Sequence, residues 1–165
     1  MKNWYLIYTK PREERLAKEN LERQGYSTYL PMVPGRRRYK GQLRRKIDPL
    51  FPRYLFIHLS DKTDNWGPIR STVGVSALVY FGNIPAKIPA QLINQLRLRE
   101  NSDGLQDITL RKYHKGDPVR IAEGPFEGFE GIFHCKSGKD RVVILLKIAE
   151  QGARVQLEQD QIEPL

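Results

Sequence analysis

The sequence predicts an α+β protein in two parts: an antiparallel sheet flanked by helices over residues 1–100, and a small β-rich domain over residues 113–165. Three observations predict this fold. A long apolar and aromatic run is typical of a central strand. Strand-like and helix-like segments then alternate along the first part. Finally, a polar, aperiodic stretch at residues 101–112 is typical of an interdomain linker, and short glycine-punctuated strands follow it.

The longest apolar and aromatic run is Asp48–Ile57. Two prolines bracket its start, so the chain enters extended. In its second half, strand alternation puts Tyr54 and Phe56 on one side and Leu55 and Ile57 on the other. Both sides are therefore apolar, and two interpretations stay open. The strand is either buried on both faces, or one face is core and the other is an exposed docking surface.

The other elements of the first part follow from local signals. Pro11 suits the first turn of a helix and Gly25 suits its C-terminal stop. Apolar spacing predicts a second helix near the end of the first part. The expected elements are strands at 4–8, 26–30 and 75–81, helices between 11 and 25 and at 89–99, and a short helix near 64–70.

A strongly basic segment runs into the central strand. We expect it to form a long hairpin with its tip near Lys40 and Gly41, because seven cations without an acid repel one another and resist burial. It should project into solvent and contact phosphates. We call it the basic hairpin; its cations are Arg36, Arg37, Arg38, Lys40, Arg44, Arg45 and Lys46.

Charge indicates a polyanionic partner. The formal net charge is +9, and residues 1–100 hold 19 Lys and Arg against 8 Asp and Glu, whereas residues 101–165 hold 9 against 11. No apolar run reaches the roughly 20 residues of a membrane span. The single cysteine, Cys135, suits a reducing cytoplasm, and with three histidines it makes a zinc site improbable. No nucleophile–base pair or phosphate loop is present, so we expect neither an enzyme nor a cofactor.

In the second part, short strands are expected at 116–121, 132–134, 141–148 and 154–158. Turns rich in glycine separate them. Strands of this length and spacing suit a small SH3-like barrel.

At this point the residues resemble a known family. The second part is similar to a KOW domain, through Gly116–Ile121, Gly124–Phe126 and Gly128–Gly131. The first part resembles the N-terminal domain of NusG-type transcription elongation factors, through Trp4–Tyr5, Phe51–Phe56 and Trp66–Val75. Within the family the chain looks closer to the specialised RfaH-like branch, through Tyr8–Lys10, Leu21–Gln24, Pro49–Pro52 and Phe81–Gly82.

The resemblance implies a cytoplasmic, monomeric, non-enzymatic factor that binds both large subunits of bacterial RNA polymerase. Such a factor also binds non-template DNA in paused complexes, suppresses pausing and termination, and couples transcription to translation through a ribosomal small-subunit protein. Two alternatives stay open. One is a general NusG-like elongation factor without operon specificity, and the other is a ribosome- or RNA-binding KOW protein.

The resemblance also implies site residues. The polymerase-binding face would be Leu6, Tyr8, Phe51, Pro52, Tyr54, Phe56 and Phe81. The second polymerase contact would be Asn65, Trp66 and Gly67. The DNA-binding positions would be Lys10, Arg12, Glu13, Asn20, Arg70, Thr72 and Val75. The ribosome contact would involve Phe126 and Phe129. Departures from RfaH at Pro11, Glu13, Asn20, Arg70 and Val73 leave the DNA element open.

RfaH-like proteins can also hold the C-terminal domain as an α-helical hairpin that masks the polymerase site. An acid–arginine pair helps to hold that state, and Asp48 and Arg141 occupy the corresponding positions. Pro125 and Gly131 disfavour a helix, and the β-branched run at 142–144 favours a strand. The barrel and the helical hairpin therefore both stay open.

Overall fold

The computed structural model describes residues 2–107, 129–135 and 137–161, and all structural statements below concern these residues. Its centre is the antiparallel pair β1 (Lys2–Thr9) and β5 (Tyr54–Ser60), which runs from Lys2 opposite Ser60 to Tyr8 opposite Tyr54. The sheet order is β2-β5-β1-β6, with β2 at Ser27–Tyr29 and β6 at Val75–Leu78, and β9 (Lys87–Ile88) also pairs with β1. The strands expected at 4–8 and 26–30 are confirmed as β1 and β2.

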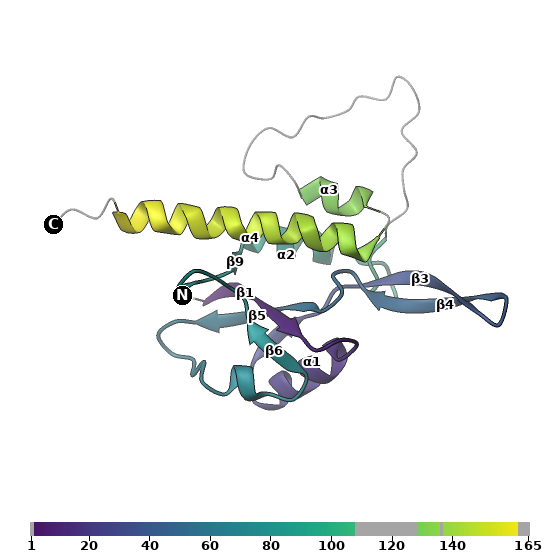
Figure 1. The fold of residues 1–165 in the computed structure, drawn as a ribbon, viewed down its shortest axis with the longest axis horizontal. Helices are drawn as coiled ribbons and strands as arrows, with labels where there is room; N and C mark the ends of the chain where they lie inside the picture. The colour runs from purple at the N-terminus through teal and green to yellow at the C-terminus, as the bar shows by residue number, and fades with distance from the viewer. Residues whose placement is uncertain (1, 108–128, 136, 162–165) are drawn as a thin grey trace, which may run out of the picture.

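Each face of this sheet packs against its own hydrophobic core, because successive strand residues point to opposite sides. On one face, α1 (Glu14–Arg23) contributes Ala17 and Leu21 to a core with Ile7 and Ile57. On the other face, α2 (Ala90–Leu98), α3 (Phe129–His134) and α4 (Gly138–Gln161) cover the side of Leu6. Figure 1 shows α1 on one side of the sheet and α4 running across the other. The central pair is therefore buried on both faces.

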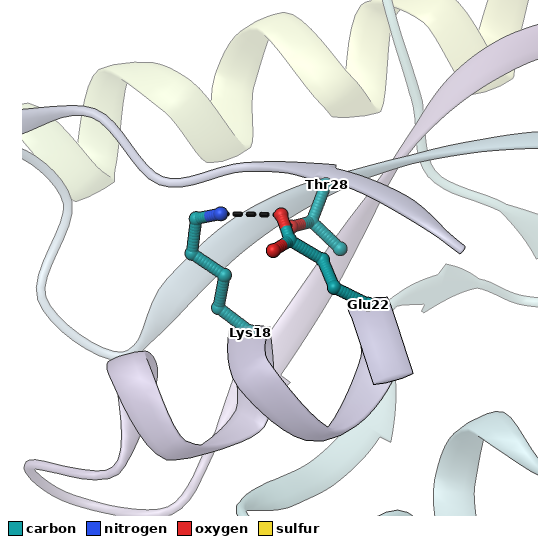
Figure 2. A network of polar contacts seen from close by, with 3 residues as sticks. All are labelled: Lys18, Glu22 and Thr28. Carbon is teal, nitrogen blue, oxygen red and sulfur yellow. Dashed lines mark hydrogen bonds and ion pairs between the residues drawn. The ribbon is translucent and has the colours of Figure 1, made fainter. Parts of the chain in front are cut away.

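Helix α1 starts later than its proline predicts. Arg12 has φ 63°, a left-handed conformation that interrupts the helix, and the first helical residue is Glu14. The helix is fastened to the sheet by a polar contact drawn in Figure 2, where Glu22 accepts hydrogen bonds from Lys18 and from Thr28 of β2. The Lys18 ammonium lowers the pKa of Glu22, and the Thr28 hydroxyl adds to this effect.

The basic hairpin forms as expected, from β3 (Met32–Tyr39) and β4 (Gln42–Pro49). Its two-residue turn is Lys40 and Gly41, with φ 49° and 78°. Two positive φ values give a turn whose twist matches the flanking strands. Figure 1 shows the hairpin extending away from the sheet and the helices.

The segment expected as one strand at 75–81 is divided. It forms β6 and then β7 (Tyr80–Phe81), which pairs with β8 (Ile84–Pro85). The backbone of Val79 bridges the two parts, because its N–H donates to Leu6 O and its carbonyl accepts from the Ala86 N–H. The expected short helix lies at Ile69–Ser71.

The strands expected at 132–134, 141–148 and 154–158 are wrong for the described structure, which has α3 and α4 there. Helical spacing explains the difference. Leu145, Ile148, Ala149 and Ala153 recur every three or four residues and are all buried. Tertiary burial of this stripe outweighs the local strand preference of 142–144. The strand expected at 116–121 lies outside the described residues.

None of the helices that the structure describes is long and apolar enough to cross a membrane. Residues 101–107, expected as the start of the linker, are attached to the first part. The Asn101 N–H donates to Leu105 O, Gln106 N–H donates to Met32 O, and Asp107 N–H donates to Arg99 O. The domain boundaries themselves stay a prediction.

Gly74 gives a test of how tightly α1 is packed on the sheet. Its φ is +97°, and a Cβ there would lie 2.7 Å from Ala17 N. We expect Gly74→Ala to lower the free energy of unfolding by about 3 kcal/mol, from backbone strain and overpacking together. Gly82→Ala is the control, because its φ is +64° but nothing lies within 4 Å. Urea unfolding measures both, and equal losses would contradict the packing argument.

Candidate functional site

The residues expected to bind polymerase gather on the face of the sheet opposite α1. Leu6, Phe51 and Phe56 are fully buried there, and Tyr54 and Phe81 pack against the same cluster. Tyr8 joins through its ring, whose centroid lies 5.1 Å from that of Tyr54. Pro52 is exposed at the edge. We call these seven residues the aromatic face.

Helices α3 and α4 cover the aromatic face. Phe129, Ile132 and Phe133 of α3, and Leu145 and Ile148 of α4, are buried in the same cluster. Figure 1 shows α4 lying across the sheet. In this conformation most of the aromatic face is therefore closed to a partner.

Two glycines allow α4 to approach closely. A Cβ at Gly138 would lie 2.6 Å from Pro52 Cγ, and one at Gly152 would lie 3.2 Å from Lys87 O. The first distance is far below normal contact, so a side chain at 138 requires the helix or Pro52 to move. Sequence alone gave no reason to expect glycine at these contacts.

Arg141 anchors α4 with a buried charge. It is 6 % exposed; its Nε donates to Leu50 O at 2.7 Å, and its Nη1 donates to Cys135 O at 3.0 Å. Burial lowers the pKa of Arg141, and Cys135 and Asp48 nearby act against that shift.

The acid–arginine pair implied by the resemblance is not a direct ion pair in this conformation. Arg141 does reach the start of the central strand, but its hydrogen bonds go to backbone carbonyls. Asp48 instead lies 3.8 Å from the ammonium of Lys46, its neighbour on β4. Asp48 therefore acts on Arg141 only through the field of its charge.

Arginines of the first part add cation–π contacts that sequence reasoning missed. The Arg99 guanidinium lies 3.6 Å from the ring centroid of Phe133, which joins the end of α2 to α3. Arg97 lies over the rings of Trp4 and Tyr29, at 5.4 and 5.2 Å. Such contacts contribute about 0.5–2 kcal/mol each, depending on exposure.

A network of buried hydrogen bonds attaches the start of the expected linker to β2 and α2. Tyr29 donates its hydroxyl proton to Glu100, and fully buried Gln106 donates to both Tyr29 Oη and Leu96 O. Burial, with the hydrogen bond to Glu100, raises the pKa of Tyr29 far above its ordinary value. No pattern in the sequence singles out Gln106.

Arg53 forms a strained corner between the aromatic face and α1. Its φ is 72°, and its N–H donates to the buried carboxylate of Glu14 at 3.1 Å. Its Nε donates to Thr9 O, and its guanidinium lies 4.1 Å from the Tyr8 ring centroid. Arg53 thereby holds the Tyr8 end of the aromatic face in place.

The positions expected to bind DNA lie on the α1 side of the sheet. The Lys10 N–H donates to Gly74 O, and Asn20 Nδ2 donates to Val73 O, so α1 and the loop before β6 meet. Lys10, Arg12 and Arg70 are exposed, and Glu13 is half-buried.

Two of the expected DNA-binding residues are not accessible in this conformation. Thr72 is 7 % exposed; its hydroxyl donates to Pro68 O and accepts from Gln24 Nε2. Val75 is 4 % exposed and belongs to the core beneath α1. In this conformation their contacts hold the loop, and DNA binding by Thr72 and Val75 stays a prediction.

The expected second polymerase contact is a loop anchored by its tryptophan. Trp66 Nε1 donates to Ser60 O at 2.9 Å, and its ring packs edge-on against Tyr5 at 4.7 Å. Asn65 and Gly67 are exposed, and Asn65 Oδ1 accepts from the Gly67 N–H. Asn65 and Gly67 are the more exposed part of this contact, and Trp66 is partly buried.

Of the two residues expected to contact the ribosome, Phe126 lies outside the described residues. Phe129 is 5 % exposed and packs in the cluster under α3. It is therefore closed to a partner while α3 and α4 lie on the sheet.

Residues 2–97 match the family model described as transcription termination factor nusG. The chain belongs to the NusG family. It is 26 % identical over 175 residues to the transcription termination/antitermination protein NusG of Staphylococcus epidermidis, covering 99 % of this chain and 96 % of that protein. NusG of Thermus thermophilus is 25 % identical over 179 residues, covering 96 % of both chains.

A solved structure titled "Domain interaction in Thermotoga maritima NusG" is also similar, with a TM-score of 0.44 and 25 % identity over 75 % of this chain and 67 % of that one. Membership of the NusG family confirms the expectation of a transcription factor of the termination/antitermination class, and not an enzyme. In the part of the chain that the structure describes, no group of three or more His, Cys, Asp or Glu could hold a metal ion.

The contacts of Arg141 predict that one substitution loosens the cover. Arg141→Met keeps much of the apolar stem but leaves two carbonyls without their donor. Since a hydrogen bond to a charged group contributes about 1.5–3 kcal/mol, we expect opening of α4 to become at least ~10-fold more frequent. Hydrogen exchange of the α4 amides measures it. Arg154→Met is the control, because Arg154 is exposed and pairs only with Glu150. Equal exchange in the two variants would contradict the anchoring role.

Proposed function

We propose that this NusG-family protein is a cytoplasmic, RfaH-like elongation and antitermination factor that binds both large subunits of bacterial RNA polymerase. The observation that carries the proposal is the aromatic face, built on the central strands and covered by two helices of the same chain. A NusG-type factor needs a docking surface, and an apolar surface of this kind is a liability while it is exposed.

The cover supports the RfaH-like branch over a general elongation factor. α3 and α4 bury the residues proposed for docking, so the covered chain binds polymerase only after the helices leave. The cost of uncovering lowers the apparent affinity by the fraction of open molecules. A factor controlled in this way acts only where another signal favours opening.

The α1 side of the sheet supplies a second surface for that signal. Lys10, Arg12 and Arg70 are exposed cations there, and Asn20 lies beside them on α1. We propose that these residues contact the non-template DNA strand of a paused complex. The two surfaces lie on opposite faces of one sheet, so polymerase and DNA can be bound together without competing for space.

The C-terminal residues have a second proposed partner, a ribosomal small-subunit protein. Phe129 is one of its proposed contacts and is buried under α3 here. Ribosome binding therefore requires the same departure of the helices as polymerase binding. The alternative function, ribosome or RNA binding without polymerase, has the same requirement.

The docking role is tested by removing a partly exposed aromatic residue. We expect Tyr54→Ala to weaken binding to RNA polymerase at least ~30-fold, since buried aromatic anchors contribute about 2 kcal/mol or more in interfaces. Phe56→Ala is unsuitable, because Phe56 is fully buried and its loss would destabilise the fold by about 3–5 kcal/mol. Leu98→Ala is the control, since Leu98 is 80 % exposed on α2. Unchanged polymerase binding by folded Tyr54→Ala protein would contradict the proposal.

The RfaH-like branch is tested separately with paused elongation complexes. We expect the intact protein to bind tightly only when the non-template strand is exposed, whereas Arg141→Met should bind with less dependence on that strand. Arg70→Gln should reduce the preference between DNA sequences more than the overall affinity. Equal binding with and without the exposed strand would point to a general elongation factor.

A further inference from the structure

The register of the basic hairpin pairs cations with cations. Each pairing joins residues directly opposite on β3 and β4. The fully cationic pairs are Arg36 with Arg45 and Arg37 with Arg44. Like charges directly opposite in an antiparallel pair are destabilising. The acid in the ladder is Asp48, which is already paired with Lys46 near the base.

The pleat distributes these cations over both faces of the ribbon. Opposite positions share a face and successive positions alternate, so the register assigns positions 36 and 45 to one face of the ribbon and positions 37 and 44 to the other. A hairpin that rests on a flat surface needs cations on one face only. A β-ribbon with cationic positions on both faces is suited to a partner that presents anions to both faces at once.

The hairpin has the shape for such an environment. Eight-residue strands span about 27 Å at roughly 3.4 Å per residue. Figure 1 shows none of the other sheets or helices of the described residues alongside its outer half. At the tip, the Tyr39 ring holds two cations, with Arg44 at 5.1 Å and Lys40 at 5.6 Å from its centroid.

We propose that the basic hairpin inserts lengthwise into the major groove of duplex B-form DNA, with each face contacting the phosphates of one groove wall. The major groove, about 12 Å wide, admits a two-stranded β-ribbon. Its two walls are phosphate backbones, which supplies the anions that both faces require. The inference deepens the proposed function, since it rests on the hairpin's contact with nucleic acid and names the partner as duplex DNA.

Two other cations of the first part, Lys18 and Arg53, do not share this arrangement. On α1, Lys18 is paired with Glu22, as Figure 2 shows. Immediately before β5, Arg53 donates a hydrogen bond to Thr9 O and lies over the Tyr8 ring. Lys18 and Arg53 are thus engaged within the protein, whereas the register of the hairpin puts arginine positions directly opposite one another.

The test compares two double variants that differ only in the face they neutralise. Arg36→Gln with Arg45→Gln removes one cross-strand pair, and Arg37→Gln with Arg44→Gln removes the next. Both lower the formal net charge of +9 by two. Lys18→Gln with Arg154→Gln is the control, because it makes the same charge change at positions already paired with acids.

Binding of the intact protein to a short DNA duplex is measured over a salt series without polymerase. Each lost phosphate contact reduces the slope of log K against log salt by about 0.9. We therefore expect both hairpin variants to reduce the slope by about 2 and to lose duplex affinity equally, while the control keeps it. The Arg→Lys versions of both pairs should retain the slope, because phosphate contacts need charge more than planar geometry.

Each other outcome overturns the inference in a recognisable way. Loss from one face alone would mean that the hairpin lies against one side of the DNA. Equal affinity for a single strand or for duplex RNA, whose major groove is deep and narrow, would exclude groove insertion. No loss in either variant would remove the hairpin from nucleic-acid binding altogether. Polymerase binding by Tyr54→Ala is unaffected by any of these results, so the docking proposal stands or fails separately.

Discussion

The structure depends on one constraint: β1 and β5 carry large apolar side chains on both faces, so the sheet needs two covers. Leu6 and Phe56 face one way, and Ile7 and Ile57 face the other. At about 25 cal/mol per Å² of apolar surface, leaving either face open costs several kcal/mol. One cover is supplied by α1, ten residues long with a narrow apolar side. The second face is larger, and the nine residues of α2 need the help of α3 and α4.

This constraint separates the permanent cover from the conditional one. α1 is joined to the sheet by short connections, by the Glu14–Arg53 hydrogen bond and by the close approach of Gly74 to Ala17. α3 and α4 are held instead by Arg141 of α4, by the ring of Phe133 of α3 against Arg99, and by apolar contact. A buried charge is costly to desolvate, so the hydrogen bonds of Arg141 hold α4 only as long as both carbonyl partners stay in place. The same chain thus has one face that is core and one that can serve a partner.

Local signals predict the first part well, because they coincide with tertiary needs. The turn residues Lys40 and Gly41, the alternation in 54–57 and the helix stop at Gly25 each specify a backbone that the fold also requires. The candidate site residues are harder to predict, because a resemblance to a family identifies a position in the sequence but does not say whether its side chain is exposed. Thr72 and Val75 are buried, while Arg53 and Gln106 matter through contacts with residues distant in sequence. The C-terminal helices could not be predicted for a related reason. Residues 142–144 favour a strand locally, and the apolar residues at 145, 148 and 149 favour a helix only because the sheet beneath buries them.

The glycines of α4 have a consequence for how the cover behaves as a unit. Gly138 and Gly152 let the helix lie close to Pro52 and Lys87. Gly152 lies inside α4, where a glycine lowers the intrinsic stability of the helix by about 1 kcal/mol relative to alanine. Gly152 therefore allows α4 to lie close to the sheet but weakens the isolated helix. Because helices in proteins are stabilised mainly by tertiary packing, the helical order of α4 and its docking on the sheet strengthen each other. A competitor for the aromatic face thus need not displace a preformed rod, since it captures the surface while the freed segment gains chain entropy.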